Sequence, residues 1–224
     1  AHKLALLAEI AFGKKVNFAS VVVEGIDAIT IEDINAAADM GYRVKLLGVS
    51  QMTELGLEQR MTPCLVSASS PLGQLEGGTN MVILEGQHSG QIVLRGAGAG
   101  EGPTASAVLS DIIDIARGQR MDTFGQPASS LLDAKPGTAT TSAPFYLRLQ
   151  LLDKPGALAR IAAIMGKAKI SIDRMRQYGH NTDSAPVLIV THKTNRNAID
   201  QILTEFSKTK LLGSTPVALR IESI

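Results

Sequence analysis

The feature that most constrains the fold is a change of hydrophobic period that recurs through residues 144–224. Apolar side chains alternate with polar ones over 145–151, as a half-buried strand requires, and then recur at helical spacing over 158–165. Two strands, a helix and a last strand follow in the pattern, at 170–177, 187–192, 199–206 and 216–223. The order β-α-β-β-α-β predicts a ferredoxin-like unit, with two helices on one side of a four-stranded sheet.

Two helical patterns open the chain. The first helix is predicted to bury one apolar stripe, formed by Leu4, Leu7, Ile10 and Ala11. Gly13 stands where that helix should end, and an apolar extended segment is expected over 16–26. A second helix is predicted after Thr30, because Asp33 stands three residues on, in a weaker relative of the capping box; Gly41 marks its end.

The next segment is rich in β-formers. Four short runs between Tyr42 and Arg95 are separated by turn signals, and a helix is predicted over 103–116. Residues 119–143 gather Gly, Pro, Ser, Thr and Ala without periodicity, so they are interpreted as a linker between domains at 1–118 and 144–224. The predicted class is α+β: a mixed sheet with helices on one face, followed by the ferredoxin-like unit.

Composition excludes several classes of protein. Lysine and arginine number 22 against 21 acidic residues, and no basic run is interleaved with aromatics, so no nucleic-acid partner is expected. Neither a membrane-spanning stretch nor an export signal is visible, and the single cysteine, Cys64, lies in an apolar run. We therefore expect no membrane partner, and a cytoplasmic protein with Cys64 in its core. The histidines lack metal-ligand spacing, so no metal site is predicted at His2, His88, His180 or His192.

The sequence DKPGAL, at 153–158, joins the first strand of the C-terminal unit to its first helix. Asp153 is expected to cap this helix, Pro155 suits its first turn, and Gly156 lets the backbone approach another molecule closely. The backbone N–H groups of Gly156, Ala157 and Leu158 then face out of a positive helix end, which favours the carboxylate of a small amino acid. The alternative is an ordinary capped turn.

The same region resembles the ACT regulatory domain over 144–224. The resemblance is carried by DKPGAL, by ISI at 170–172, by a glutamine at the end of the second strand, and by VTH at 190–192. It implies that an amino acid binds at the loop, at the interface of paired copies. The implied ligand-facing residues are Asp153, Gly156, Ala157, Leu158 and Gln177.

A glycine-rich turn connects the last β-rich run of the first domain to the predicted helix. Its glycines are Gly96, Gly98, Gly100 and Gly102. Glu101 stands where a dinucleotide fingerprint needs its third glycine, and no Gly-Lys-Ser or Gly-Lys-Thr follows. By these rules the turn is a tight corner between a strand and a helix.

Four spaced motifs in the first 119 residues nevertheless resemble homoserine dehydrogenase: AHKLALLA, YRVKLLG, the set PCLV, SPL and GGTNMV, and GAGAGEGPTASAVLSDIIDIA. The resemblance implies hydride transfer between NAD or NADP and C4 of homoserine, which interconverts homoserine and aspartate 4-semialdehyde. It makes Lys3 the catalytic acid or base and Gly100 the cofactor contact, with threonine as the usual inhibitor. The alternative for Lys3 is a solvated surface lysine.

The family's nucleotide-binding domain and its substrate-binding acidic residues should precede Ala1. The chain begins there without a methionine, directly in an amphipathic stretch, so we expect that upstream sequence has been removed and that this chain alone is inactive. A dimer is expected, because both regions should bury faces against a symmetric partner. Two alternatives stay open: a free-standing amino-acid-sensing dimer, and a nucleotide-binding protein that uses the glycine turn alone.

Overall fold

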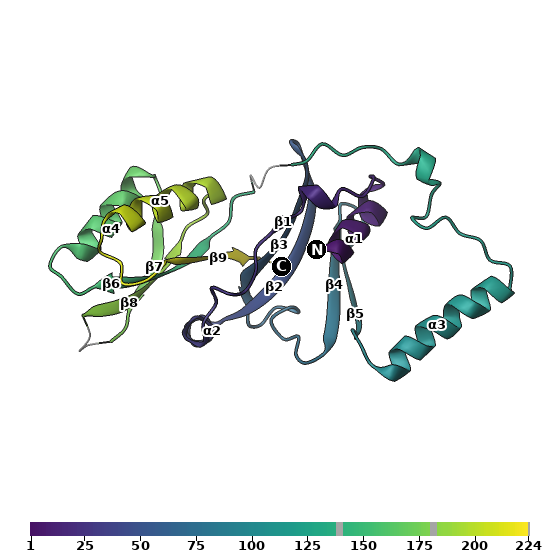
Figure 1. Ribbon diagram of the computed structural model, residues 1–224, viewed down its shortest axis with the longest axis horizontal. Helices are drawn as coiled ribbons and strands as arrows, with labels where there is room; N and C mark the ends of the chain where they lie inside the picture. The colour runs from purple at the N-terminus through teal and green to yellow at the C-terminus, as the bar shows by residue number, and fades with distance from the viewer. Residues whose placement is uncertain (138–140, 180–182, 224) are drawn as a thin grey trace.

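The computed structural model describes residues 1–137, 141–179 and 183–223, so His180 and residues 138–140 of the expected linker lie outside it. Figure 1 shows the C-terminal unit at one end, a group of long strands in the middle and a lone helix, α3, at the other end. None of the described helices is both long and apolar enough to cross a membrane.

Helix α1 (His2–Phe12) ends as predicted, since Gly13 adopts a left-handed conformation with φ 60° and its N–H donates to the Glu9 carbonyl at 2.8 Å. Of the predicted stripe, Leu4 is buried, but Leu7, Ile10 and Ala11 are exposed. The buried residues are Leu4, Ala5, Ala8 and Glu9. Leu7 and Ile10 are 44% and 56% exposed. Leu4 packs on Gly48 and Met61 of the strands beneath, and this contact turns the small side chains inward rather than the larger apolar ones.

The extended segment expected over 16–26 is shorter than predicted. A 3₁₀ turn, η1 (Phe18–Ser20), precedes a two-residue strand, β1 (Val22–Val23). Helix α2 (Ile31–Asp39) then begins with the predicted capping box. The Thr30 hydroxyl accepts from the Asp33 N–H, and the Asp33 carboxylate accepts from the Thr30 N–H at 3.0 Å. Gly41, with φ 81°, follows the end of this helix.

All four predicted β-rich runs form strands. β2 (Tyr42–Thr53) and β3 (Gly56–Ser67) are antiparallel partners over their whole length. β4 (Thr79–Gly86) and β5 (Gly90–Ala97) form a separate two-stranded sheet, and helix α3 (Glu101–Ala116) follows it.

The C-terminal unit has the predicted order. Its elements are β6 (Phe145–Leu152), α4 (Ala157–Lys167), β7 (Ile172–Gln177), β8 (Ser184–Thr191), α5 (Arg196–Lys208) and β9 (Val217–Glu222). The strands lie side by side in the order β9-β6-β8-β7. Helices α4 and α5 cover one face, where alternate strand residues such as Leu147 and Ile189 pack with Ile161, Ile199 and Phe206.

The two regions share one sheet, which the sequence analysis did not predict. β9 pairs with β3 in parallel, through Cys64–Arg220, Leu65–Ile221 and Val66–Glu222, so the sheet runs from β1 to β7 and includes β2. Helix α2 covers the face opposite α4 and α5, where Ala37 packs with Leu65 and Tyr146. The C-terminal unit therefore has a helix from the first region on its second face.

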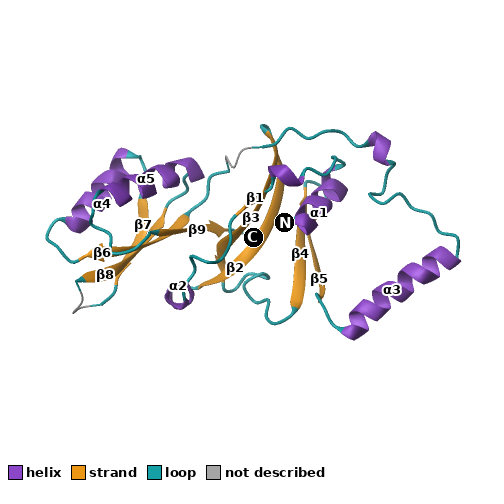
Figure 2. Ribbon diagram, viewed as in Figure 1, coloured by secondary structure: helices purple, strands orange, loops and turns teal. Residues whose placement is uncertain are grey.

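Among its described residues, 117–137 and 141–144, the segment between α3 and β6 contains one short 3₁₀ turn, η2 (Ala128–Ser130), and is otherwise drawn as loop (Figure 2). Its second half follows the first region closely. Leu131 is buried, the Leu132 carbonyl accepts from Lys15 N–H at 2.9 Å, and the Lys135 carbonyl accepts from Leu57 N–H at 2.9 Å. This part of the segment is fixed along the end of α1 and the start of β3.

Candidate functional site

Lys3 lies in the first turn of α1, and its side chain is exposed. In the described part of the chain it has no ion pair or side-chain hydrogen bond. Its neighbour His2 stacks on Phe18 with ring centroids 4.1 Å apart, which fixes the start of the helix against η1. Lys3 is therefore free to meet a group that is not part of the described chain.

The glycine turn is a tight corner, as the generic rules predicted. A Cβ on Gly98 would lie 2.6 Å from the Asn80 side chain, and the Gly98 N–H donates to the Gly78 carbonyl at 3.0 Å. Gly100 precedes α3 with φ 124°, a conformation that favours glycine. No side chain caps the first turn of α3, so its backbone N–H groups are available to an anionic ligand.

The structure does not bring Lys3 and Gly100 together. Helix α1 packs on β2 and β3, and Figure 1 shows it well apart from the start of α3, where Gly100 lies. Neither residue lines the groove between α4 and α5 or the small cavity beside Arg60 and Arg220.

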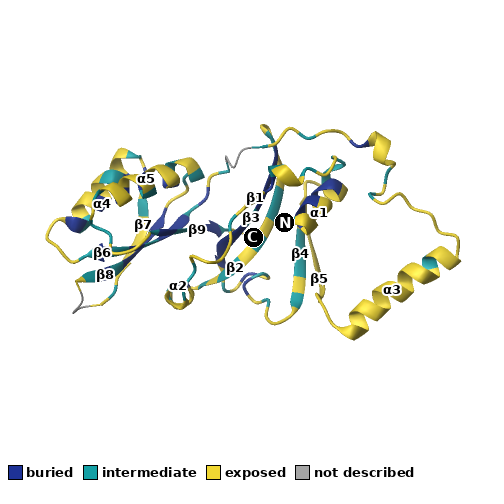
Figure 3. Ribbon diagram, in the orientation of Figure 1, coloured by how far each residue is buried: buried dark blue, intermediate teal, exposed yellow. Residues whose placement is uncertain are grey.

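Helix α3 has no buried residue, and β5 is exposed along its whole length (Figure 3). The exposed apolar side chains on these two elements are Ile92, Val93, Leu94, Val108, Leu109, Ile112, Ile113 and Ile115. Exposed apolar side chains in this number indicate an interaction site on these elements. The hairpin and helix thus expose the surface on which a further domain or a second copy could pack.

The predicted ligand loop has a different cap from the one expected. Gly156, with φ 82°, is the residue before α4, and no side chain caps the helix. The prediction that Asp153 caps α4 was wrong, because a tight turn in which Ala157 N–H donates to the Lys154 carbonyl at 3.1 Å intervenes. Pro155 accordingly lies before the helix and not in its first turn. The Ala157 N–H is already used, which leaves fewer backbone donors for a ligand than the sequence suggested.

Gln177 is the last residue of β7, as expected. It does not lie next to the 153–158 loop. The Asp153 N–H donates to the Asp183 carbonyl at 3.0 Å, which places the loop beside the start of β8. Gln177 pairs with Val187, four residues further along, or about 13 Å at strand spacing. The loop and Gln177 therefore share a sheet without being in direct contact.

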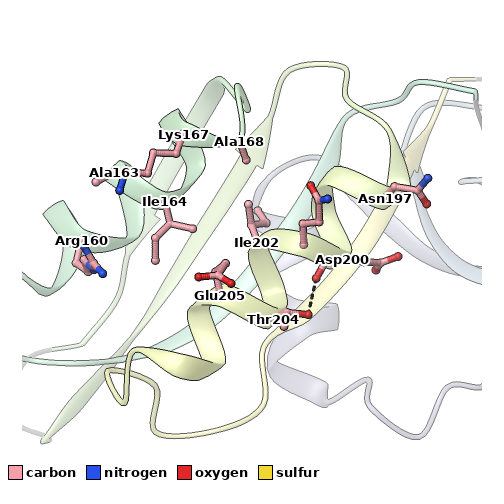
Figure 4. A pocket seen from close by; sticks show the side chains of 11 residues that line it. Arg160, Ala163, Ile164, Lys167, Ala168, Asn197, Asp200, Ile202, Thr204 and Glu205 are labelled. Carbon is pink, nitrogen blue, oxygen red and sulfur yellow. Dashed lines mark hydrogen bonds between the residues drawn. The ribbon is translucent and has the colours of Figure 1, made fainter.

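A groove between α4 and α5 was not predicted from the sequence (Figure 4). Arg160 and Lys167 line one wall, and Asp200 and Glu205 the other. The Glu205–Lys208 pair and the bond from the Thr204 hydroxyl to the Asp200 carbonyl stay within α5. The groove is open to solvent, and among the described residues no ion pair crosses from one wall to the other.

Cys64 is fully buried, as predicted. Burial raises the pKa of its thiol from 9.0 to about 11, because the thiolate would lose its hydration there. This keeps the sulfur protonated and unreactive near neutrality. In the described residues no group of three or more His, Cys, Asp or Glu side chains is arranged to hold a metal ion.

Charged side chains at the junction of the two regions were also missed. Arg60 contacts Glu58 at 3.1 Å and Glu222 at 2.9 Å, and Arg220 contacts Glu222 at 2.8 Å. Nearby, Arg148 of β6 contacts the buried Asp33 of α2 at 2.6 Å. The pairs that join the two regions, Arg60–Glu222 and Arg148–Asp33, have members far apart in the chain, so local patterns carry no signal for them, although the capping box did single out Asp33.

Comparison with known proteins agrees with the geometry. Residues 1–113 match the family described as homoserine dehydrogenase, and residues 145–210 match the ACT domain. Homoserine dehydrogenases of Neisseria gonorrhoeae and Pseudomonas aeruginosa are each 35% identical to this chain over its full length, which spans 53% and 54% of theirs. A homoserine dehydrogenase structure from Thiobacillus denitrificans superimposes with a TM-score of 0.87 at 32% identity, covering 99% of this chain and 52% of that one. The chain spans about half the length of the curated relatives it matches.

Proposed function

Because the chain belongs to the homoserine dehydrogenase family and carries an ACT domain, we propose that it acts as the C-terminal half of an NAD- or NADP-dependent homoserine dehydrogenase. The observation that carries the proposal is the match of both regions, in order, across the whole chain to about half of each relative. The exposed α3 and β4–β5 hairpin support it, because they present an apolar surface on which the other half could pack.

The residues present fit a dinucleotide in part. Gly100 and the uncapped first turn of α3 leave backbone N–H groups exposed, and a Cβ on Gly102 would meet nothing within 4 Å, so a phosphate-bearing ligand could approach closely. When bound, NAD or NADP accepts the hydride from C4 of homoserine, or returns it to aspartate 4-semialdehyde. We propose that the main nucleotide site lies in the half of the relatives that this chain does not match, and that the chain alone is therefore inactive.

Lys3 has the proton-transfer role in this proposal. As the hydride leaves C4, the Lys3 amine takes the proton from the oxygen on that carbon, and in the reverse direction it returns that proton. Exposure in the first turn of α1 leaves its ammonium group without a competing partner in the described chain.

The test joins this chain to a relative's N-terminal half and follows nicotinamide absorbance with aspartate semialdehyde. Lys3→Ala should lower kcat about 10²- to 10⁴-fold, because a positioned acid or base contributes that much. Lys15→Ala removes another exposed lysine, one that pairs with Asp133 at 3.2 Å, and should leave kcat unchanged. Absence of turnover in the joined protein, or full activity in Lys3→Ala, would reject the enzyme proposal.

We also propose that the protein is a cytoplasmic dimer. We propose further that its ACT domain binds a small amino acid, threonine, at the 153–158 loop. Gly156 favours this loop for ligand approach, because nothing lies within 4 Å of its Cβ position. Calorimetry of threonine with the chain tests the site, and Gly156→Val should abolish binding through steric block and backbone strain.

A free-standing amino-acid sensor is the second candidate. It is favoured by one observation: the face of the C-terminal sheet under α4 and α5 has a buried core built from elements of that unit. Threonine binding combined with no catalysis in the joined protein would select the sensor, whereas binding combined with catalysis would select the regulated enzyme.

A further inference from the structure

Asp33 connects the two regions with a single carboxylate. Its Oδ2 accepts from the backbone N–H of Thr30 at 3.0 Å and from the Thr30 hydroxyl at 3.1 Å, which closes the N-terminus of α2. Its Oδ1 accepts from Arg148 Nε at 2.6 Å and from the Tyr146 hydroxyl at 3.3 Å, both on β6. One side chain thus binds a helix of the first region and a strand of the ACT domain.

Because Asp33 and Arg148 are buried or nearly so, the contacts of Asp33 with α2 and with β6 depend on each other. Asp33 is fully buried and the Arg148 side chain is 15% exposed, so neither charge is well hydrated. Separation of β6 from α2 would leave a buried carboxylate without its cationic partner, which is strongly unfavourable. Burial and the Asp33 charge also raise the pKa of Tyr146, so its hydroxyl remains protonated and can donate. The start of α2 and this part of β6 must therefore move together.

Strand β6 leads from the contact with Asp33 to the 153–158 loop. Arg148 lies four residues before Leu152, the end of the strand, and the 153–158 loop follows directly. On the other side, α2 packs on β2, and the β2–β3 pair carries α1 through Leu4 and Met61. A continuous series of packed elements thus links the loop of the ACT domain to the helix that bears Lys3.

Ala37 of α2 also packs on Tyr146 of β6, but the polar contacts of β3 with β9 are of a different kind. The β3–β9 pairing and the Arg60–Glu222–Arg220 cluster join strands within one sheet. Asp33 instead joins that sheet to a helix on its face, and its second oxygen determines how that helix begins. A shift of β6 would therefore change the capping of α2.

We propose that Asp33 is a positioning residue through which the 153–158 loop and helix α2 influence each other's stability. The regulatory use of this connection rests on the amino-acid site proposed above. The connection itself rests on the contacts of Asp33, and it operates with or without a ligand.

Amide hydrogen exchange of the full chain tests the connection without ligand. Arg148→Met should speed exchange over 31–39 at least tenfold, although the substitution lies on another element, while α4 and α5 keep their wild-type rates. Arg148→Lys should restore slow exchange, since the lysine ammonium can reach the position now held by Nε. Glu205→Gln is the matched control: it removes a carboxylate from an exposed pair with Lys208 and should leave α2 unchanged.

A second variant, Thr30→Ala, tests the same connection from the side of α2 and can be used if Arg148→Met does not fold. Thr30→Ala removes the hydroxyl on the α2 side of Asp33 and should speed exchange in β6 and over 153–158, because coupling between two sites is reciprocal. Unchanged exchange on the far element in the folded variants, or equal acceleration in every element, would overturn the proposal.

Threonine then tests the regulatory use. In the wild type and in Arg148→Lys, threonine should alter amide exchange both over 153–158 and over 31–39. In Arg148→Met, it should alter exchange over 153–158 only. A response confined to the loop in the wild type would overturn the regulatory use. No response at the loop would reject the amino-acid site, while the ligand-free comparison would still decide the role of Asp33.

Discussion

The two regions of the chain differ in how completely they bury their own apolar residues. In the C-terminal unit, both faces of the sheet are covered: α4 and α5 pack on one and α2 on the other. In the N-terminal region, α3 and β5 expose apolar residues along their length, and α1 buries a narrow face. The C-terminal unit therefore buries both faces of its sheet, one of them with the help of α2 from the N-terminal region. The β4–β5 hairpin and α3 have no comparable core among the described residues.

The largest expected effect lies in the ACT core. Phe206 is fully buried between α5 and the sheet, so Phe206→Ala should lower the free energy of unfolding by about 3–5 kcal/mol, through lost burial and the cavity left behind. Urea denaturation followed by circular dichroism measures it. A loss below 1 kcal/mol would show that this core is not the stable part of the chain.

The second largest loss of stability is expected at the cluster of charged side chains between the two regions. Glu222 contacts both Arg60 and Arg220, so Glu222→Gln should lower the free energy of unfolding by about 3 kcal/mol, because two buried guanidinium groups lose their shared partner. Asp133→Asn, which breaks the exposed pair with Lys15, should change it by less than about 1 kcal/mol. Equal effects in the two variants would mean that the junction adds no stability.

Because Cys64 is buried at the same junction, we expect the free energy of unfolding to depend on pH in the alkaline range. Its folded pKa of about 11 exceeds the ordinary 9.0, so the folded state holds the proton more tightly. Stability from this group is complete below pH 9 and falls as pH rises from 9 to 11, by up to about 3 kcal/mol. Cys64→Ala should remove that part of the decline, as measured by urea unfolding at pH 8, 9 and 10. Parallel declines in both proteins would contradict the assignment.

The smallest effect on folding is expected on α3. Ile112 is 54% exposed, so Ile112→Ser should change the free energy of unfolding by less than about 0.5 kcal/mol. The same change should weaken self-association in sedimentation velocity, because it makes the exposed apolar surface more polar. A large loss of stability would show that α3 packs within this chain after all.

Part of the candidate site could be predicted from the sequence, and part could not. The strand–helix order of the ACT domain, the capping box at Thr30 and the glycine corner depend on residues within a few positions of one another. The cap of α4 was missed because the turn from Lys154 to Ala157 inserts Gly156 between Asp153 and the helix. The groove on α4 and α5 was missed because its walls come from separate helices.

The sequence by itself determined the elements of this protein and the family to which it belongs. Periodicity, caps and glycines act over short distances, and motifs such as AHKLALLA and DKPGAL can be read directly from the chain. The tertiary structure decided which face of α1 is buried, that β9 extends the sheet from β3, and that Arg148 reaches Asp33. These features depend on contacts between residues that are distant in the sequence, and local preferences carry no information about such contacts.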